Sequence, residues 1–203
     1  PGTFYAAAVT QAIAVEVELM FRPRFITRTN YGYQANPVLV DGDYPTLENG
    51  GAVLNDVTVK VGEPYFDSTT FAVQAATTEL QLKQLVVTGK IKAGLKWDDG
   101  EPFTVKDFLF AWKMNCDPAG TAAVDLTFCP FGSAPGAAGI LSNYEATDDT
   151  TVVATYVPGS LDATYMLTPF GPYGVLPEHL FTGKTVTEIE VDERATGGQN
   201  SMP

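Results

Sequence analysis

The sequence has little of what a metal site or a membrane span requires. Among its 203 residues there are two cysteines and one histidine, His179. These cannot supply the four ligands of a zinc site without carboxylates, and no C-x-x-C spacing is present. The longest uncharged, mainly apolar run, residues 4–15, is too short to cross a bilayer, which takes about 20 residues. We therefore expect no metal, no cofactor and no membrane span. The chain also does not start with a signal-peptide pattern, so any export signal is expected upstream of Pro1.

Basic residues are also scarce. There are 12 lysines and arginines against 24 aspartates and glutamates, which gives a net charge of −12. The only dense basic group is Arg22, Arg24 and Arg28. A nucleic-acid surface needs many more clustered cations, so we expect no nucleic-acid partner. An excess of acidic residues of this size is usual for an exported protein. The negative charge repels such a protein from anionic surfaces.

Catalytic motifs are missing as well. The sequence contains no G-x-S-x-G, H-E-x-x-H, G-x-x-x-x-G-K-[ST] or G-x-G-x-x-G. A Ser-His-Asp triad would depend on the single His179, for which a structural role is the simpler interpretation. The acidic pairs Asp98/Asp99 and Asp148/Asp149 could suggest a glycosidase, but each lies in an expected turn, where aspartate is favoured anyway. We expect no enzyme.

Residues 90–112 carry the clearest local pattern. Residues 90–97 alternate polar and apolar side chains, which predicts a strand. The DDG sequence that follows predicts a tight turn, and Pro102 prevents a ladder from continuing. Thr104 is a natural N-cap, and Asp107 three residues later can complete a capping box. A helix should therefore start after Thr104. Its core-facing stripe, at i, i+3, i+4 and i+7, consists of Val105, Phe108, Leu109 and Trp112.

The rest of the chain predicts a mixed fold that is rich in loops, since glycine and proline make 19 and 14 residues. We expect a helix over residues 6–21, strands over 57–61, 85–92 and 151–156, and a helix that begins at Pro177. Residues 25–40 are aromatic and β-leaning. Residues 62–84 predict an added hairpin or loop, whose Tyr65, Phe66 and Phe71 either cover a surface or contact a partner. Residues 116–139 lack regular periodicity and predict an irregular boundary between two parts.

Three segments of the chain resemble segments of a known family and occur in the same order. The sequence GLKWDDGEPFTVKDFLF at residues 94–110 resembles the "GvkW-DG-pfTa-Dv-f" signature of the family 5 extracellular solute-binding proteins. These are the oligopeptide- and dipeptide-binding components of ABC importers. PTLENGG at residues 45–51 is similar to the stretch before the first strand of that family's extra subdomain. ATDDTTVVATY at 146–156, with GVLPEHL at 174–180, resembles its "DdyTvvvt…iLPkH" run.

The resemblance implies an α+β fold of the periplasmic-binding-protein-like type II. The chain would hold part of the N-terminal lobe, with residues 1–21 and 140–203 as pieces of lobe I. Residues 22–139 would form the extra subdomain of lobe I, including an insertion near 62–84 that the family pattern does not place. Lobe II of the same polypeptide would be absent, so we expect a fragment.

The function implied is capture of peptides, or of a related small solute, outside the cytoplasmic membrane. The solute would then be delivered to the membrane permease of an ABC importer. The implied location is extracytoplasmic, either periplasmic or on a cell-surface lipoprotein. The alternative that stays open is a secreted protein-interaction module that uses the aromatic insertion and binds no solute.

Residue roles also come from the resemblance. It places Thr3, Phe4, Tyr5, Phe128 and Phe131 near the ligand, although a core role would suit these aromatics equally well. The residues assigned to folding rather than to the ligand are Trp97, Asp99, Gly100, Pro102, Phe103, Thr104, Asp107 and Trp112.

The two cysteines, Cys116 and Cys129, are expected to form a disulfide, because the implied compartment is oxidising. The intervening sequence is turn-prone at its start. Closing this loop would restrict the unfolded chain by about 3 kcal/mol in the loop-entropy model. The alternative is two buried free thiols.

Overall fold

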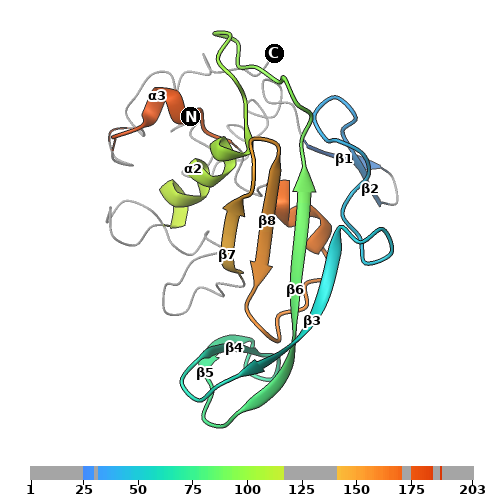
Figure 1. Cartoon of the computed structure of the whole chain (residues 1–203), viewed down its shortest axis with the longest axis vertical. Helices are drawn as coiled ribbons and strands as arrows, with labels where there is room; N and C mark the ends of the chain where they lie inside the picture. The colour runs from blue at the N-terminus through green and yellow to red at the C-terminus, as the bar shows by residue number, and fades with distance from the viewer. Residues whose placement is uncertain (1–24, 30–31, 117–140, 171–174, 185–187, 189–203) are drawn as a thin grey trace.

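The computed structural model describes residues 25–29, 32–116, 141–170, 175–184 and 188 (Figure 1). Its centre is a four-stranded antiparallel sheet with the order β3-β6-β8-β7. The four strands are β3 (Ala52–Val59), β6 (Leu80–Lys90), β8 (Thr151–Tyr156) and β7 (Leu141–Ala146). The mixed α+β class expected from the sequence is confirmed.

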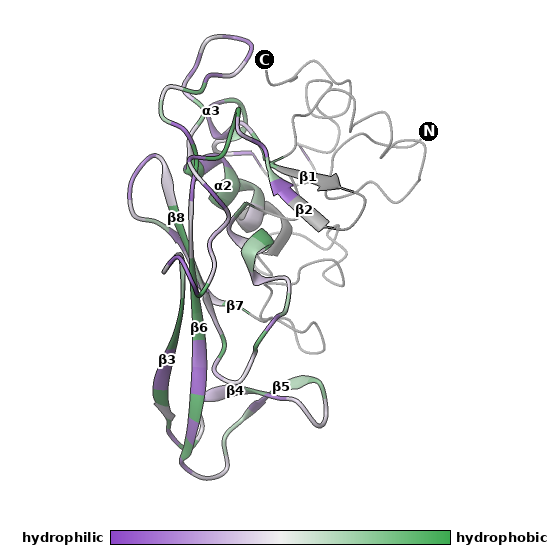
Figure 2. Ribbon diagram, turned by 90° about the vertical axis from the view of Figure 1, so that its right-hand side faces the viewer, coloured by the Kyte–Doolittle hydropathy of each residue, from purple (hydrophilic) through white to green (hydrophobic). Residues whose placement is uncertain are grey.

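Helical segments cover one face of this sheet (Figure 2). The covering segments are α2 (Val105–Cys116) and the 3-10 helix η2 (Tyr165–Phe170), and the short α3 (Glu178–Phe181) packs against α2. Strand β8 shows why this face is covered. Its sequence TVVATY buries every second side chain almost completely, namely Val152, Ala154 and Tyr156. A strand with this alternation requires a packed layer on one side.

Two hairpins complete the described chain. One is formed by β1 (Ile26–Thr29) and β2 (Gly32–Ala35), and the other by β4 (Pro64–Asp67) and β5 (Ala72–Ala75). The β4–β5 hairpin lies at the far end of the long β3–β6 ribbon (Figure 1). The hairpin or loop expected in residues 62–84 is thus a hairpin.

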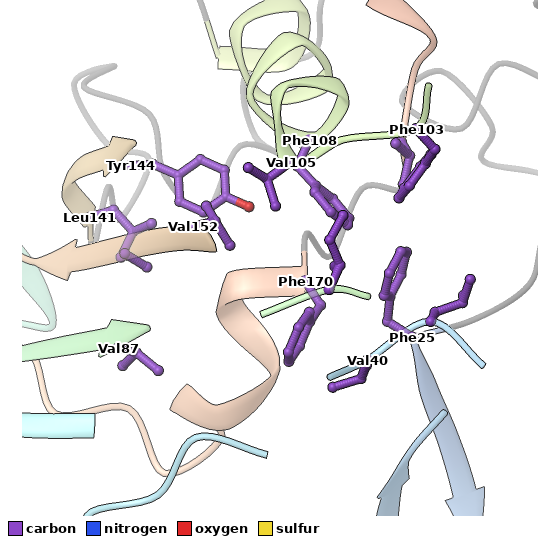
Figure 3. Close-up of a cluster of buried hydrophobic side chains, with 14 of the residues drawn as sticks. Phe25, Val40, Val87, Phe103, Val105, Phe108, Leu141, Tyr144, Val152 and Phe170 are labelled. Atoms are coloured by element: carbon purple, nitrogen blue, oxygen red, sulfur yellow. The ribbon is translucent and has the colours of Figure 1, made fainter. Parts of the chain in front are cut away.

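The core is a cluster of buried aliphatic and aromatic side chains between the helical layer and the sheet (Figure 3), and several phenylalanine rings meet within it. The ring of Phe25 lies 4.9 Å from that of Phe108, edge to face, and 5.9 Å from that of Phe170, stacked. Phe103 joins the same group at 6.0 Å from Phe25. Such ring pairs contribute about 0.5–1.5 kcal/mol each beyond the area they bury. The cluster therefore fixes α2, η2 and the segment before β1 on one another.

The helix expected after Thr104 is confirmed as α2, with Val105 and Phe108 buried and Leu109 and Trp112 partly buried. The strand expected over residues 90–97 is wrong. Strand β6 ends at Lys90, and isolated bridges at Ile91 and Lys96 are all that follows. A turn at residues 93–94, where Gly94 has φ +78°, interrupts the extended chain.

The other strand expectations differ mainly at their ends. The strand expected over residues 57–61 is the end of β3, which stops at Val59, and the one expected over 85–92 is the second half of β6. The strand at Thr151–Tyr156 is confirmed as β8, and the helix after Pro177 as α3. The helix expected over residues 6–21, and nearly all of the irregular stretch over 116–139, lie outside the described residues. The division into lobe I and an extra subdomain stays a prediction.

Candidate site: a buried aspartate that joins two signature segments

One buried carboxylate connects the two most distinctive sequence segments. Asp107, in the first turn of α2, is only 3% exposed. Its Oδ2 accepts hydrogen bonds from the Thr104 N–H at 2.9 Å and from the Trp97 Nε1–H at 3.3 Å. Its Oδ1 accepts one from the Glu178 N–H at 2.9 Å, across 71 positions of sequence. Both oxygens of a single side chain are therefore used to fix three separate donors.

The start of α2 shows how the sequence produces this arrangement. The first N–H groups of a helix have no partner within the helix. Here the Lys106 N–H donates to Thr104 Oγ1 at 3.2 Å, and the Val105 N–H donates to the carbonyl of Asp149 at 3.0 Å. The Asp107 carboxylate in turn accepts the Thr104 N–H, which is one half of the capping box expected from the sequence. The other half differs, because the Thr104 hydroxyl accepts the Lys106 N–H while the Asp107 N–H donates to the Thr104 carbonyl at 3.1 Å. The Asp149 contact also ties the helix to the β7–β8 turn.

Asp107 also caps a second helix. The residue before α3 is Pro177, which makes no side-chain cap. Glu178, the first residue of α3, would leave its N–H without an acceptor if Asp107 were absent. The Asp107 carboxylate supplies that acceptor, and the Asp107 carbonyl accepts the Leu176 N–H at 3.4 Å. The segment around LPEH is thereby held on α2.

Burial sets the charge state of this carboxylate. Desolvation raises the pKa of Asp107 above its ordinary value of 3.8, and the hydrogen bonds from Thr104, Glu178 and Trp97 oppose that rise. A charge in an apolar layer costs free energy unless it is hydrogen-bonded. The three donors are therefore what allow this side chain to remain there.

A second contact joins the same two segments at the surface. His179 Nε2 lies 2.8 Å from Asp99 Oδ2, and the His179 ring lies 6.3 Å from the Trp97 ring. Asp99 Oδ1 also accepts the Glu101 N–H at 3.0 Å, and Gly100 completes the turn with φ +90°. The hydrogen bond with His179 is the main reason that the pKa of Asp99 is lowered.

This arrangement is a joint between two segments of the chain. The contacts of His179 described above are a carboxylate and an indole ring, and neither is a Ser, Cys or Thr side chain that a histidine base could activate. The described part of the chain holds no group of three or more His, Cys, Asp or Glu side chains that could bind a metal ion. None of its helices is long and apolar enough to cross a membrane.

The structure brings most of the predicted folding residues together. Trp97 and Phe103 are 4% exposed and their rings meet at 5.2 Å, while Pro102 is exposed and bridges to Lys96. Trp112, two turns further along α2, contacts the Tyr144 ring at 5.8 Å instead of the joint.

The predicted ligand-binding residues and the predicted disulfide fall largely on other parts of the chain. Thr3, Phe4, Tyr5, Phe128 and Phe131 lie outside the described residues, and so does Cys129. Cys116 is the last residue of α2, and its side chain is also outside the described part.

Sequence reasoning missed the contacts of Asp99 with His179 and of Asp107 with Glu178. Both segments were recognised, but no local pattern indicates that residues 71 and 80 positions apart share a hydrogen bond. The sequence features that could have indicated the Asp99–His179 contact were the acidic pair Asp98/Asp99 and the single histidine, His179.

Comparison with known proteins identifies the family. Residues 62–190 match the family described as bacterial extracellular solute-binding proteins, family 5 Middle. The match covers more than half of the chain and includes both segments joined at Asp107. The chain belongs to this family. No match is found among the curated proteins.

Solved structures show the same fold as this family 5 chain. It is similar to the oligopeptide-binding protein from Thermus thermophilus complexed with a pentapeptide, at 19% identity and a TM-score of 0.56 over 94% of this chain. It is also similar to the oligopeptide-binding protein AppA from Bacillus subtilis in complex with a nonapeptide, at 16% identity and a TM-score of 0.54 over 95% of this chain. The alignments cover 25% and 29% of those two proteins, so this chain spans only about a quarter of their length.

Proposed function

We propose that this family 5 chain serves in the solute-binding component of an ABC importer. The component captures peptides, or a related small solute, outside the cytoplasmic membrane and delivers them to a membrane permease. The observation that carries the proposal is the family match over residues 62–190. The likeness in fold to two oligopeptide-binding proteins, each in complex with a peptide, supports the choice of peptides as solute.

The proposal gives the chain one side of a two-lobed binder. Thr3, Phe4, Tyr5, Phe128 and Phe131 approach the solute, and a second lobe provides the opposite side. An extended peptide held chiefly through its backbone needs few diagnostic side chains. Binding and release then require no catalytic residue, and the protein is not an enzyme.

The proposed location is the periplasm or the outer surface of the cell, on a lipoprotein. Such a compartment is oxidising, and the proposed disulfide between Cys116 and Cys129 suits it. Within this framework the joint at Asp107 keeps α2 and the α3 segment in a fixed relation while solute enters and leaves.

Uptake by cells tests the function. Cells that lack the gene for this chain should lose uptake of a labelled mixture of short peptides, and the gene should restore it. A version that carries Asp98→Ala, a change in an exposed turn, should restore uptake as well as wild type. Unchanged uptake in the deletion strain would refute the proposal and favour a secreted protein-interaction module.

Binding by the 203-residue chain alone tests the one-sided site. A micromolar ligand corresponds to about 8 kcal/mol of binding free energy. If half of the contacts come from a second lobe, while the ligand still loses its freedom, the dissociation constant should be millimolar or weaker. Calorimetry against a mixed peptide library measures it. Sub-micromolar binding would show that the chain by itself holds a complete site.

A further inference from the structure

An exposed aromatic ring at the tip of the β4–β5 hairpin has an unusual backbone. Phe71 is 76% exposed and has φ +53°. It is the only residue other than glycine with a positive φ in the described part of the chain. Glycine adopts this region without strain, whereas a side chain with a Cβ does not. Strained residues of this kind cluster at functional sites. The position therefore keeps a large apolar side chain at a cost in stability.

The loop that presents this ring is fixed by one aspartate. Asp67 Oδ1 accepts the Thr69 N–H at 2.8 Å. Its Oδ2 accepts the Thr70 hydroxyl at 3.1 Å and the Gln74 Nε2–H at 3.4 Å. The Phe71 ring also rests on the Phe66 ring, edge to face at 6.5 Å. A loop backbone that is already ordered loses less entropy when its ring enters a partner.

The hairpin is fixed in turn to the central sheet. The Phe66 N–H donates to the carbonyl of Pro158 at 2.9 Å, and the Gly159 N–H donates to the carbonyl of Lys83 at 2.8 Å. A Cβ on Gly159 would lie 2.6 Å from the Phe66 carbonyl oxygen, so the two backbones are in direct contact. The tip therefore projects from a rigid base and is not a loose loop.

The charge around the tip indicates what it can bind. Residues 61–79 contain no lysine, arginine or histidine; of their three acidic residues, Asp67 lies at the tip, whereas Glu63 and Glu79 lie at the base of the hairpin. The hydrogen bond from the Thr69 N–H is the main reason that the pKa of Asp67 is lowered, so this group stays charged. An apolar tip that carries one charged aspartate, on a chain with net charge −12, is repelled by anionic lipid and by a second copy of the chain. It suits a protein socket that is apolar inside and basic at its rim.

We propose that the β4–β5 tip, centred on Phe71, docks into such a socket on the outer face of the importer's permease. The inference rests on the proposed function, which requires a contact with the permease that does not depend on the identity of the solute. Phe71 inserts as the apolar anchor. Asp67, at the same tip, then meets a lysine or arginine on the rim of the socket.

The test uses the full chain and the permease complex encoded with it, reconstituted in phosphatidylcholine nanodiscs. Biolayer interferometry compares wild type with Phe71→Gly, Glu79→Lys and the control Val38→Ala. The control residue is 65% exposed, similar to Phe71, and lies outside the hairpin. Phe71→Gly should weaken binding at least tenfold while raising Tm by about 2–4 °C, because the positive φ no longer carries a Cβ. Glu79→Lys should slow association, and Val38→Ala should match wild type.

Each other outcome overturns the inference. Equal binding by Phe71→Gly and wild type would exclude the ring as an anchor. Equal binding of wild type to empty nanodiscs would indicate a lipid surface. If the wild-type protein restores peptide uptake and the hairpin variants still bind the permease normally, this docking site is refuted and the proposed function stands. Loss of Tm in Phe71→Gly would show that the ring is needed for folding instead.

Discussion

Replacing Asp107 is the sharpest test of the joint between the two signature segments. Asp107→Ala removes the acceptors for the Trp97 Nε1–H, the Thr104 N–H and the Glu178 N–H. We expect the fold to remain and its stability to fall markedly. Asp107→Asn keeps the shape but replaces one oxygen with an NH₂ group, which then faces a donor.

The magnitude follows from the donors left behind. A buried donor without an acceptor costs about 1–3 kcal/mol, and loss of a helix cap about 0.5–2 kcal/mol. The Trp97 indole N–H is buried, whereas the two backbone N–H groups are half-buried and can recover part of their loss with water. The sum for Asp107→Ala is about 3–4 kcal/mol, or a Tm lowered by about 6–16 °C in a domain of this size. Asp107→Asn should cost about 1–2 kcal/mol, since its remaining oxygen still accepts.

Thermal unfolding followed by circular dichroism measures both variants, with Asp98→Ala as the control. Asp98 is exposed in the adjoining turn, and its loss should change stability by less than about 0.5 kcal/mol. A cost for Asp107→Ala no larger than that of the control would refute the reasoning. The reasoning would also be refuted if Asp107→Asn and Asp107→Ala lowered the free energy of unfolding equally, because the number of remaining acceptors would then have no effect.

The pH dependence gives an independent check on the same residue. The pKa of Asp107 is raised in the folded state, so the folded protein binds a proton more tightly there than the unfolded chain. Its stability relative to Asp107→Asn should be greatest below about pH 4 and should fall as the pH rises through the raised pKa. A relative stability that increases over that range would contradict the burial of this carboxylate.

Two further outcomes follow from the structure, and a third follows from the proposed oxidising compartment. The pKa of Asp148 is lowered to about 2, chiefly by the Thr150 hydroxyl, so unfolding curves should show an advantage over Asp148→Asn above about pH 4 that disappears as the pH falls toward 2. Gly89→Ala should lower the free energy of unfolding by about 1–3 kcal/mol, because its Cβ would lie 2.5 Å from a proline Cβ, and Gly89→Asn should be costly for the same reason. Gly100→Ala should lower it by about 1–2 kcal/mol, because φ is +90° although the space is open, whereas Gly100→Asn should regain stability because asparagine tolerates a positive φ. Thiol titration of the denatured, unreduced protein should find no free thiol at Cys116 or Cys129.

The sequence alone predicted those features in which the decisive partners are close along the chain. The cap in which Asp107 accepts the Thr104 N–H spans three residues, and the apolar stripe of α2 spans two turns. Both are therefore visible as spacing. Strand β8 was predicted for the same reason, since its alternation is complete within six residues.

The misread strand at residues 90–97 shows where periodicity fails. Ile91 and Trp97 are 1% and 4% exposed, as one face of a strand would require. Gly94, at φ +78°, turns the chain between them, so a loop delivers both side chains to the core. Ala93, which would share their face in a strand, is exposed, so the alternation in the sequence is not an alternation of burial. Only the neighbouring glycine could have indicated this, and a lone glycine in a strand pattern also suits a bulge.

The contacts at Asp107 explain why the two family segments need each other physically. Without the Glu178 N–H, Oδ1 of this buried carboxylate would lose a donor that lowers its pKa and opposes the effect of burial. Without Asp107, the N–H of Glu178, the first residue of α3, would have no acceptor, since Pro177 before it makes no side-chain cap. Each segment therefore supplies the hydrogen-bond partner that a polar group of the other would otherwise lack. The His179–Asp99 contact adds a second link at the surface. A four-residue helix is too short to be stable by itself. Its position on α2 is consequently set by the aspartate of the larger helix.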